Sequence, residues 1–343
     1  DEFFEESYKQ LLLRNPEYLT SLGLTRSFGL RNDRLNDLSA DYLRETRELE
    51  AAILDQLRTY DHDQLDSEQQ ISYDVYEWYL DNLVQGHEFA YHNYPVHHFL
   101  GSYQDELIRL FTETHPLHDR QDAEDYVARL SQVGIQVEQL LEGLAAREEM
   151  GVLPPTFIVE MTLDDLGRLA QGEAAANPLY TSFEERLGTM ENLGDSDRQA
   201  FLRSAEEEIN GTVLPALSAL LAYFEGIQPV TTDDAGLWKL PNGKEYYAYL
   251  LRSLTSTDLS PQEVHELGLA EVARIQQEMQ READRLGYPS DLGIDQLMAR
   301  VREDGGYHDT SSQAGKEQLL EAIEVLLDEV DQKLDPAFDI HPQ

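Results

Sequence analysis

Histidines beside acidic residues are the groups in this sequence best suited to hold a metal ion, and His265 with Glu266 forms such a pair. The pair lies in PQEVHELGLAEV and matches the opening of the zinc signature His-Glu-x-x-His. That signature needs a second histidine four residues on, because positions i and i+4 share one helical face. Leu269 stands there instead. The pair alone therefore predicts a structural histidine and an acid that suits a helix N-terminus.

The densest group of histidines lies in YHNYPVHHFLG, residues 91–101. Pro95 predicts irregular backbone there, and binding residues are often found in such loops. His97 and His98 are adjacent, so they diverge by about 100° on a helix and face opposite sides of a strand. One of them is expected to face a cleft, or the loop is a polar segment packed under a lid.

Three tyrosines, Tyr246, Tyr247 and Tyr249, follow the turn expected at Asn242 and Gly243. They occupy adjacent faces of one helix. Tyrosines that cannot all be buried often donate hydrogen bonds to a ligand or stabilise an oxyanion. A helix whose tyrosines bridge core and surface carries the same pattern, so both interpretations stay open.

The elements that must position these residues are predicted to be helices almost throughout, which makes the fold all-α with few or no short strands. Capping residues and apolar spacing near 3.6 mark the helix starts. Strand-like patterns are confined to 152–159 and 236–240. The expected helices begin at Pro16, cover 39–60, begin at Asp66 or Ser67, and cover 119–149, 195–224 with a kink at Pro215, 261–286, and 312–334.

The organisation predicted is one helical region over 1–343, with a possible sub-boundary near 228–236. The sequence shows no run of about 18 apolar residues, so no membrane span is expected. It opens on an acidic amphipathic stretch, unlike a secretory signal, so the compartment stays open between cytoplasmic and exported. Cysteine is absent, which excludes disulfides, thiolate metal sites and cysteine nucleophiles.

The charge is strongly acidic, with 67 Asp and Glu against 26 Lys and Arg and a net charge of −41. Such a surface repels phosphate and anionic lipid, so nucleic acid is not expected as a partner. Lysine is scarce among the basic residues. Dense carboxylates with few lysines suit a salt-loving source, and an ordinary acidic bacterial protein is the alternative.

The segment LPNGKEYYAYLLRSLTSTDLSPQEVHELGL, residues 240–269, carries a family resemblance. It resembles the bacterial family of domain of unknown function 885, whose pattern combines Leu-Pro-x-Gly, a Tyr-Tyr-x-Tyr-Leu-Leu block and Thr-Asp-Leu-(Ser/Thr)-Pro-x-Glu-(Ile/Val)-His-Glu-Leu-Gly. Further similarity lies at Pro16-Glu17, Leu22-Gly23, Tyr94-Pro95-Val96 and Val152-Leu153-Pro154-Pro155. The resemblance extends over essentially the whole chain.

The resemblance implies a helical zinc metallopeptidase similar in plan to the helical oligopeptidases and carboxypeptidase Taq. In family members the zinc motif, a His-Glu-x-x-Pro-Gly-His-His block, follows this region. The chain is therefore expected to be an N-terminal part that holds no zinc and is inactive alone, with the C-terminal part of the same protein as partner.

In that interpretation zinc belongs to the full-length protein, and the present residues form a cleft wall for a peptide substrate. The chain itself supplies no catalytic or metal residue. Its candidate substrate-binding residues are Tyr246, Tyr247, Tyr249, His265, His97 and His98. The alternative is a helical binding or scaffold module without catalysis.

Overall fold

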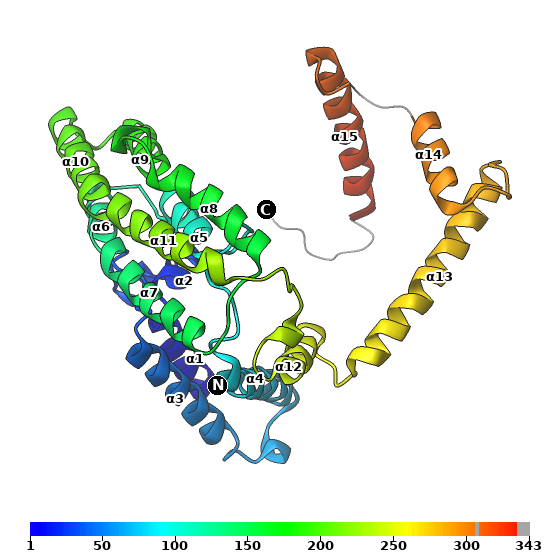
Figure 1. The fold of residues 1–343 in the computed structure, drawn as a ribbon, viewed down its shortest axis with the longest axis horizontal. Helices are drawn as coiled ribbons and strands as arrows, with labels where there is room; N and C mark the ends of the chain where they lie inside the picture. Colours follow the sequence, from blue (N-terminus) through cyan, green and yellow to red (C-terminus); the bar gives the residue numbers. More distant parts are fainter. Residues whose placement is uncertain (306–308, 335–343) are drawn as a thin grey trace. The chain divides into compact units, whose positions relative to one another are not determined.

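The computed structural model describes residues 1–305 and 309–334, and within them the chain forms helices joined by turns and loops (Figure 1). No strand occurs in these two ranges, so the all-α prediction is confirmed. The chain divides into two units, Asp1–Asp258 and Leu259 onward. Residues 228–236, where the sequence indicated a possible sub-boundary, lie inside the first unit.

The first unit contains twelve α-helices, and the described part of the second contains three. Those of the first unit are α1 (Glu2–Leu13), α2 (Pro16–Ser21), α3 (Ala40–Leu57), α4 (Ser67–Gly86), α5 (Tyr103–Arg109), α6 (Arg120–Leu130), α7 (Val133–Glu149), α8 (Thr156–Ala170), α9 (Pro178–Gly188), α10 (Asp195–Glu208), α11 (Leu214–Ile227) and α12 (Gly243–Thr255). Those of the second are α13 (Pro261–Arg285), α14 (Ile294–Asp304) and α15 (Gln313–Leu334).

The predicted helix starts are confirmed by side-chain caps. The Asn15 side chain accepts from the backbone N–H of Tyr18 ahead of α2, and Ser39 does the same for α3. Asp66 forms a capping box at α4, and Ser260 forms one with Glu263 at α13. Each cap satisfies a backbone donor that has no partner within the helix.

The single helix expected over 119–149 is instead two helices, α6 and α7. The N–H of Gln132 bonds the carbonyl of Arg129, three residues back, which tightens the chain into a turn. The Gln132 side chain also donates to the carbonyl of Asp33. This long-range bond fixes the break, and it cannot be read from local periodicity.

The helix expected over 195–224 runs through a π-helical turn at Ile209–Val213. Pro215 has no N–H for the carbonyl of Gly211 four residues back, and the wider turn contains that carbonyl.

The stretch Asp195–Val230 is long and apolar enough to cross a membrane, with a mean hydropathy of 1.3 over 18 residues. Length and composition alone do not establish a span, because a core helix passes the same test. In this unit α11 lies beside α8 (Figure 1).

The two strand-like segments were wrong predictions. Residues 152–155 form no regular element and α8 begins at Thr156, and Pro154 and Pro155 have no N–H to donate to a ladder. One backbone bond, from Thr156 N to Thr232 O at 2.9 Å, joins this stretch to its neighbour. At 236–240 a 3₁₀ turn forms over Leu237–Lys239.

The main core of the first unit is formed by side chains from the helices α5 to α11, together with Leu35 and Val96 from preceding loops. The ring of Tyr126 stacks on Phe183 with centroids 4.1 Å apart, and Phe111 meets it edge-on at 4.9 Å. A smaller core joins α1, α3 and α4 around Leu57 and Leu80. Burial of these side chains is the main favourable contribution to folding.

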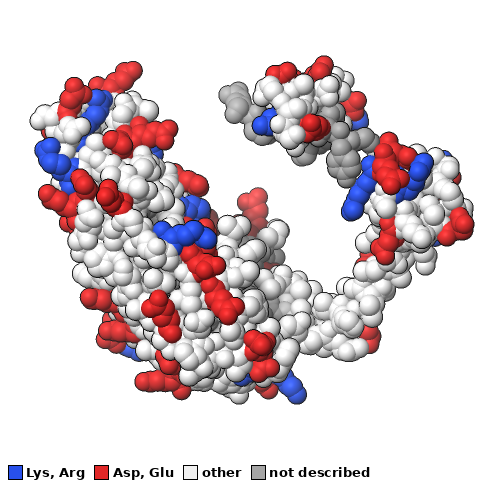
Figure 2. All heavy atoms as spheres, turned by 45° about the horizontal axis from the view of Figure 1, so that its top comes forward, with Lys and Arg blue, Asp and Glu red and all other residues white. Residues whose placement is uncertain are grey.

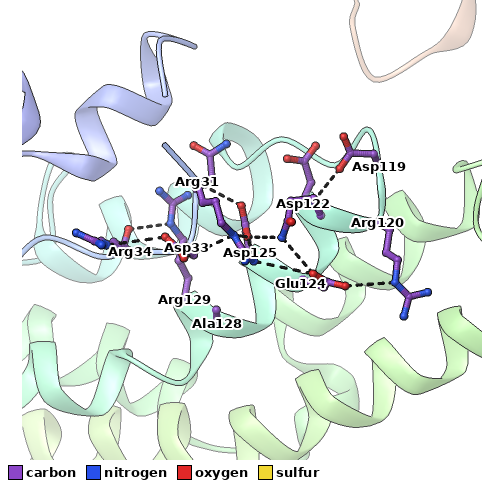
Figure 3. Close-up of polar contacts among 12 residues, drawn as sticks. Arg31, Asp33, Arg34, Asp119, Arg120, Asp122, Glu124, Asp125, Ala128 and Arg129 are labelled. Atoms are coloured by element: carbon purple, nitrogen blue, oxygen red, sulfur yellow. Dashed lines mark hydrogen bonds and ion pairs between the residues drawn. The ribbon is translucent and has the colours of Figure 1, made fainter. Parts of the chain in front are cut away.

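An ionic network of two buried aspartates and two half-exposed arginines attaches the loop that follows α2 to α6 (Figure 3). Arg26 pairs with Asp122, whose side chain is fully buried, at 2.7 Å. Arg31 pairs with Asp125 at 2.5 Å, and the second oxygen of that carboxylate accepts from the N–H of Asn32 at 2.9 Å. The two carboxylates therefore anchor the irregular loop between α2 and α3.

Arg129 lies at the centre of this network and is fully buried. Its guanidinium donates to the Arg34 carbonyl, to the Thr20 hydroxyl and to Nδ1 of His115. The Nε2–H of His115 donates in turn to the carbonyl of Asp122 at 2.9 Å. These bonds fix the tautomer of His115. Burial, followed by the charge of Arg129, lowers the pKa of His115 to about 3, so this imidazole is neutral.

Candidate functional site

Two tyrosines of α12 take part in an aromatic cluster, defined here as Phe89, His92, Tyr246 and Tyr249. Tyr246 is 7% exposed, and its ring centroid lies 5.1 Å from that of His92. Tyr249 stacks on Phe89 at 5.4 Å. The cluster joins α12 to the end of α4 and the loop that follows it, so two of the candidate tyrosines serve packing.

His92 is held in this cluster by its Nε2–H, which donates to the carbonyl of Pro241 at 2.8 Å. Its Nδ1 is buried and has no hydrogen-bond partner among the described residues. Burial raises the pKa of Tyr246, and burial raises that of Tyr94 nearby to about 12. Both phenols are therefore hydrogen-bond donors at neutral pH and cannot act as bases.

Two glycines allow α12 to approach its neighbours closely. A Cβ at Gly86 would lie 2.3 Å from the hydroxyl of Tyr249. A Cβ at Gly243 would lie 1.9 Å from the carbonyl oxygen of Leu237, which is backbone and cannot move aside as a side chain can. The glycine of the Leu-Pro-x-Gly pattern is therefore required by contact at the first turn of α12.

Replacing Gly243 with alanine is expected to destabilise the first unit by about 1–3 kcal/mol, the range for overpacking. The control is Gly226→Ala on α11, where no atom lies within 4 Å of the added Cβ. That substitution should be neutral or stabilising by up to about 1 kcal/mol. Urea unfolding followed by circular dichroism measures both, and equal effects would contradict the contact.

The other candidates lie elsewhere. Tyr247 is 47% exposed and does not join the aromatic cluster. His265 is exposed on α13, in the second unit, one turn into the helix. Glu266 beside it accepts from the side chain of Gln262 at 2.7 Å. Within the first unit, the structure brings together Tyr246 and Tyr249 and leaves Tyr247 apart.

His97 and His98 are both half-buried in the loop before α5. Nδ1 of His97 accepts from the N–H of Phe99 at 3.1 Å, and burial, then the neighbouring His98, lowers its pKa. His98 lines a cavity of about 220 Å³ with Gln104 and Asp105 of α5. His97 is not among the residues that line this cavity.

Sequence reasoning missed Gln104 and Asp105. Ser102 caps α5 by accepting from Asp105 N, which is visible as a serine three residues before an acid. Nothing local to the sequence shows that Gln104 is 4% exposed. Its burial depends on α5 packing against the core.

Zinc does not fit any group of side chains in the described part of the chain. Residues 1–305 and 309–334 contain no set of three His, Cys, Asp or Glu placed to hold a metal ion. The incomplete motif at His265 is open to solvent on one helix. No catalytic step is therefore routed through a metal here.

Comparison with protein families decides the classification. The family described as "Bacterial protein of unknown function (DUF885)" matches residues 16–343. The chain belongs to this family. A comparison of the DUF885 chain with curated proteins found no match.

A solved structure has the same fold as this DUF885 chain. It is the crystal structure of a protein from Colwellia psychrerythraea described as a "putative lipoprotein", with a TM-score of 0.85 and 20% sequence identity. The match covers 99% of the present chain and 61% of the other protein. The chain thus spans less than two thirds of the length of that relative.

Proposed function

We propose that this chain forms the N-terminal scaffold and one wall of the substrate cleft of a zinc-dependent peptidase or amidohydrolase. The zinc motif lies in the remaining part of the same protein, beyond these residues. In the first unit, Tyr247, His97 and His98 are at least partly exposed and are the candidates available for substrate contact, whereas Tyr246 and Tyr249 pack in the aromatic cluster. His265 is a separate, exposed candidate in the second unit. Their phenol and imidazole groups suit the carbonyl and N–H groups of a peptide.

The observation that supports the scaffold part of this proposal is the exposed apolar surface of the second unit. On α15, Leu320, Ile323, Leu327 and Val330 are spaced as one helical stripe and are 41–61% exposed. Leu267, Leu269 and Val272 on α13 are more than half exposed. Stable helices in proteins bury such a stripe against another element.

The core of the second unit is small for helices of this length. Among its described residues, Ala283 and Leu297 are the apolar side chains that are buried. Contiguous exposed apolar faces mark interaction sites. The remaining polypeptide of the same protein is the partner proposed for them, which agrees with the 61% coverage of the longer relative.

The test is hydrolysis of a peptide library by a polypeptide that continues past Gln343, with residues 1–343 alone as control. The longer polypeptide should cleave peptides, lose activity to a chelator and regain it with zinc. The shorter one should be inert. A longer polypeptide that is folded and inert with zinc present would favour the alternative, a helical binding module.

The acidic composition leads us to propose adaptation to salt as well. Acidic side chains are scattered over the surface seen in Figure 2 and outnumber the basic ones there. Most of the 67 acidic residues have no cation to pair with, since Lys and Arg number 26. Their mutual repulsion destabilises the folded state when ions are dilute.

The melting temperature is therefore expected to rise clearly between 0.01 M and 1 M sodium chloride, where the screening length falls from about 30 Å to about 3 Å. Potassium chloride should act alike, because screening needs no specific site. Thermal melts at fixed pH measure this, with a neutral helical protein of equal size as control. A flat melting temperature would end the halophile proposal.

A further inference from the structure

The exposed face of α15 combines its apolar stripe with a pattern of charge. Leu320, Ile323, Leu327 and Val330 recur at spacings of three and four residues, as the a and d positions of a heptad do. Gly315 is the buried residue of α15 within the part of the chain that the structure describes. No described element therefore buries the stripe.

Acidic residues form a row along one edge of this stripe. Glu317, Glu324 and Asp331 recur every seven residues, at heptad position e. At 100° per residue they lie about 60–100° from the centre of the stripe, so they border it. Glu317 accepts from the side chain of Gln313, and Glu324 and Asp331 make no ion pair with a described residue. The row is thus an uncompensated negative edge.

The opposite edge of the stripe is apolar. Leu319 and Leu326 are seven residues apart and lie about 60–80° from the centre of the stripe, on the side away from the acidic row. Leu326 is 60% exposed. A surface that covers α15 therefore meets carboxylates along one edge and leucines along the other. Such asymmetry selects the partner and its orientation.

A second copy of α15 is a poor match for this face. In an antiparallel pair the two acidic rows would face each other, and like charges across an interface repel. In a parallel pair each acidic row would lie against the leucine row of the other copy. A helix with Lys or Arg in the facing row instead neutralises the carboxylates and keeps the apolar contact.

We propose that α15 docks against a helix of the remaining polypeptide of the same protein, and that this helix carries an apolar stripe bordered by a row of Lys or Arg. Charge complementarity gives the chemistry of the partner. The greater length of the relative with the same fold, of which the match covers 61%, gives a source for it. The inference rests on the proposed function for the identity of the partner polypeptide, but it needs neither zinc nor hydrolysis.

Hydrogen exchange of α15, followed by mass spectrometry, tests the docking. It is measured in residues 1–343 and in the polypeptide that continues past Gln343. Backbone amides of a docked helix open less often and so exchange more slowly. The amides of 313–334 are expected to exchange at least roughly tenfold more slowly in the longer polypeptide.

Charge reversal tests the acidic row. Glu324→Lys combined with Asp331→Lys keeps the stripe and sets lysines against Lys or Arg. In the longer polypeptide this double variant is expected to speed the exchange of α15 roughly tenfold, because like charges now oppose each other across the interface. In residues 1–343 alone it should not speed exchange. Molar sodium chloride should reduce the difference in the longer polypeptide, since it screens the repulsion.

The matched control is Glu321→Lys combined with Glu329→Lys. It changes the charge of α15 equally, but both positions lie about 140° from the centre of the stripe. The control should exchange as the unaltered longer polypeptide does. Circular dichroism establishes that both double variants keep their helices.

Equal exchange of α15 in the two polypeptides would overturn the proposal. So would a reversed variant that stays protected, or a control that loses as much protection, because α15 would then respond to net charge alone. Protection in residues 1–343 that rises with protein concentration would assign the face to a second copy instead. A peptidase assay on the same samples separates the two proposals: an inert longer polypeptide that protects α15 contradicts the proposed function and supports this docking.

Discussion

Replacing Arg129 with methionine is expected to lower the free energy of unfolding of the first unit by about 3–5 kcal/mol, because three acceptors lose their donor and each buried acceptor left unsatisfied costs about 1–3 kcal/mol. The substitution leaves the Arg34 carbonyl, the Thr20 hydroxyl and the buried Nδ1 of His115 without their donor. It also removes a positive charge near Asp125, whose field acts on the guanidinium. Burial lowers the pKa of Arg129 to about 10, so the side chain is charged at neutral pH.

The matched control is Arg203→Met on α10, an exposed arginine with no hydrogen bond or ion pair to the described residues. That change should stay within about 0.5 kcal/mol of the unaltered protein. The free energy of unfolding of Arg129→Lys should fall between those of Arg129→Met and Arg203→Met, because a single ammonium group cannot reach all three acceptors that the planar guanidinium bonds. Urea unfolding gives the three values. Equal stability of the Arg129 and Arg203 variants would contradict the network.

The stability of the first unit is expected to fall as pH drops from about 6.5 toward 3, because of His115. Its pKa in the folded protein is lowered to about 3 from the ordinary 6.5. Below pH 6.5 the unfolded chain therefore takes up a proton that the folded one excludes. The contribution is about 1.4 kcal/mol per pH unit within that window.

His115→Gln isolates this contribution from the carboxylates that also titrate in acid. A glutamine can accept from Arg129 but has no charged form. The variant is expected to be less stable at pH 7 by about 1–3 kcal/mol, and its deficit should shrink as the pH falls to 4.5. His265→Gln, at an exposed position, serves as control. Parallel pH profiles for His115→Gln and the unaltered protein would exclude a neutral, buried imidazole.

Helix starts were predictable from sequence because their determinants are local. A serine at 260 with a glutamate at 263 bonds the same three-residue span that the sequence displays. The break between α6 and α7 at Gln132 was not predictable from sequence, because the Gln132 side chain bonds the carbonyl of Asp33, which is distant in sequence. The strand expected at 236–240 was a wrong prediction for a different reason. A short apolar run has no periodicity that separates a strand from a 3₁₀ turn.

The candidate site was predictable only in part. Histidines and tyrosines are conspicuous by type, and His98 lines a cavity. Gln104 and Arg129 are not conspicuous, because polar residues on a helix usually face water. Asp122 and Asp125 in RQDAEDYVAR have the pattern of a solvated face, yet the loop after α2 buries them. Burial of this kind is a property of the tertiary fold.

The measurement that most directly tests the central proposal is the zinc content of two polypeptides after dialysis. One is residues 1–343, and the other continues past Gln343 to the end of the protein. Elemental analysis should find no stoichiometric zinc in the first, because none of its described residues form a fitting ligand set. It should find one zinc per chain in the second. One tightly held zinc in residues 1–343, or none in the longer polypeptide, would contradict the account.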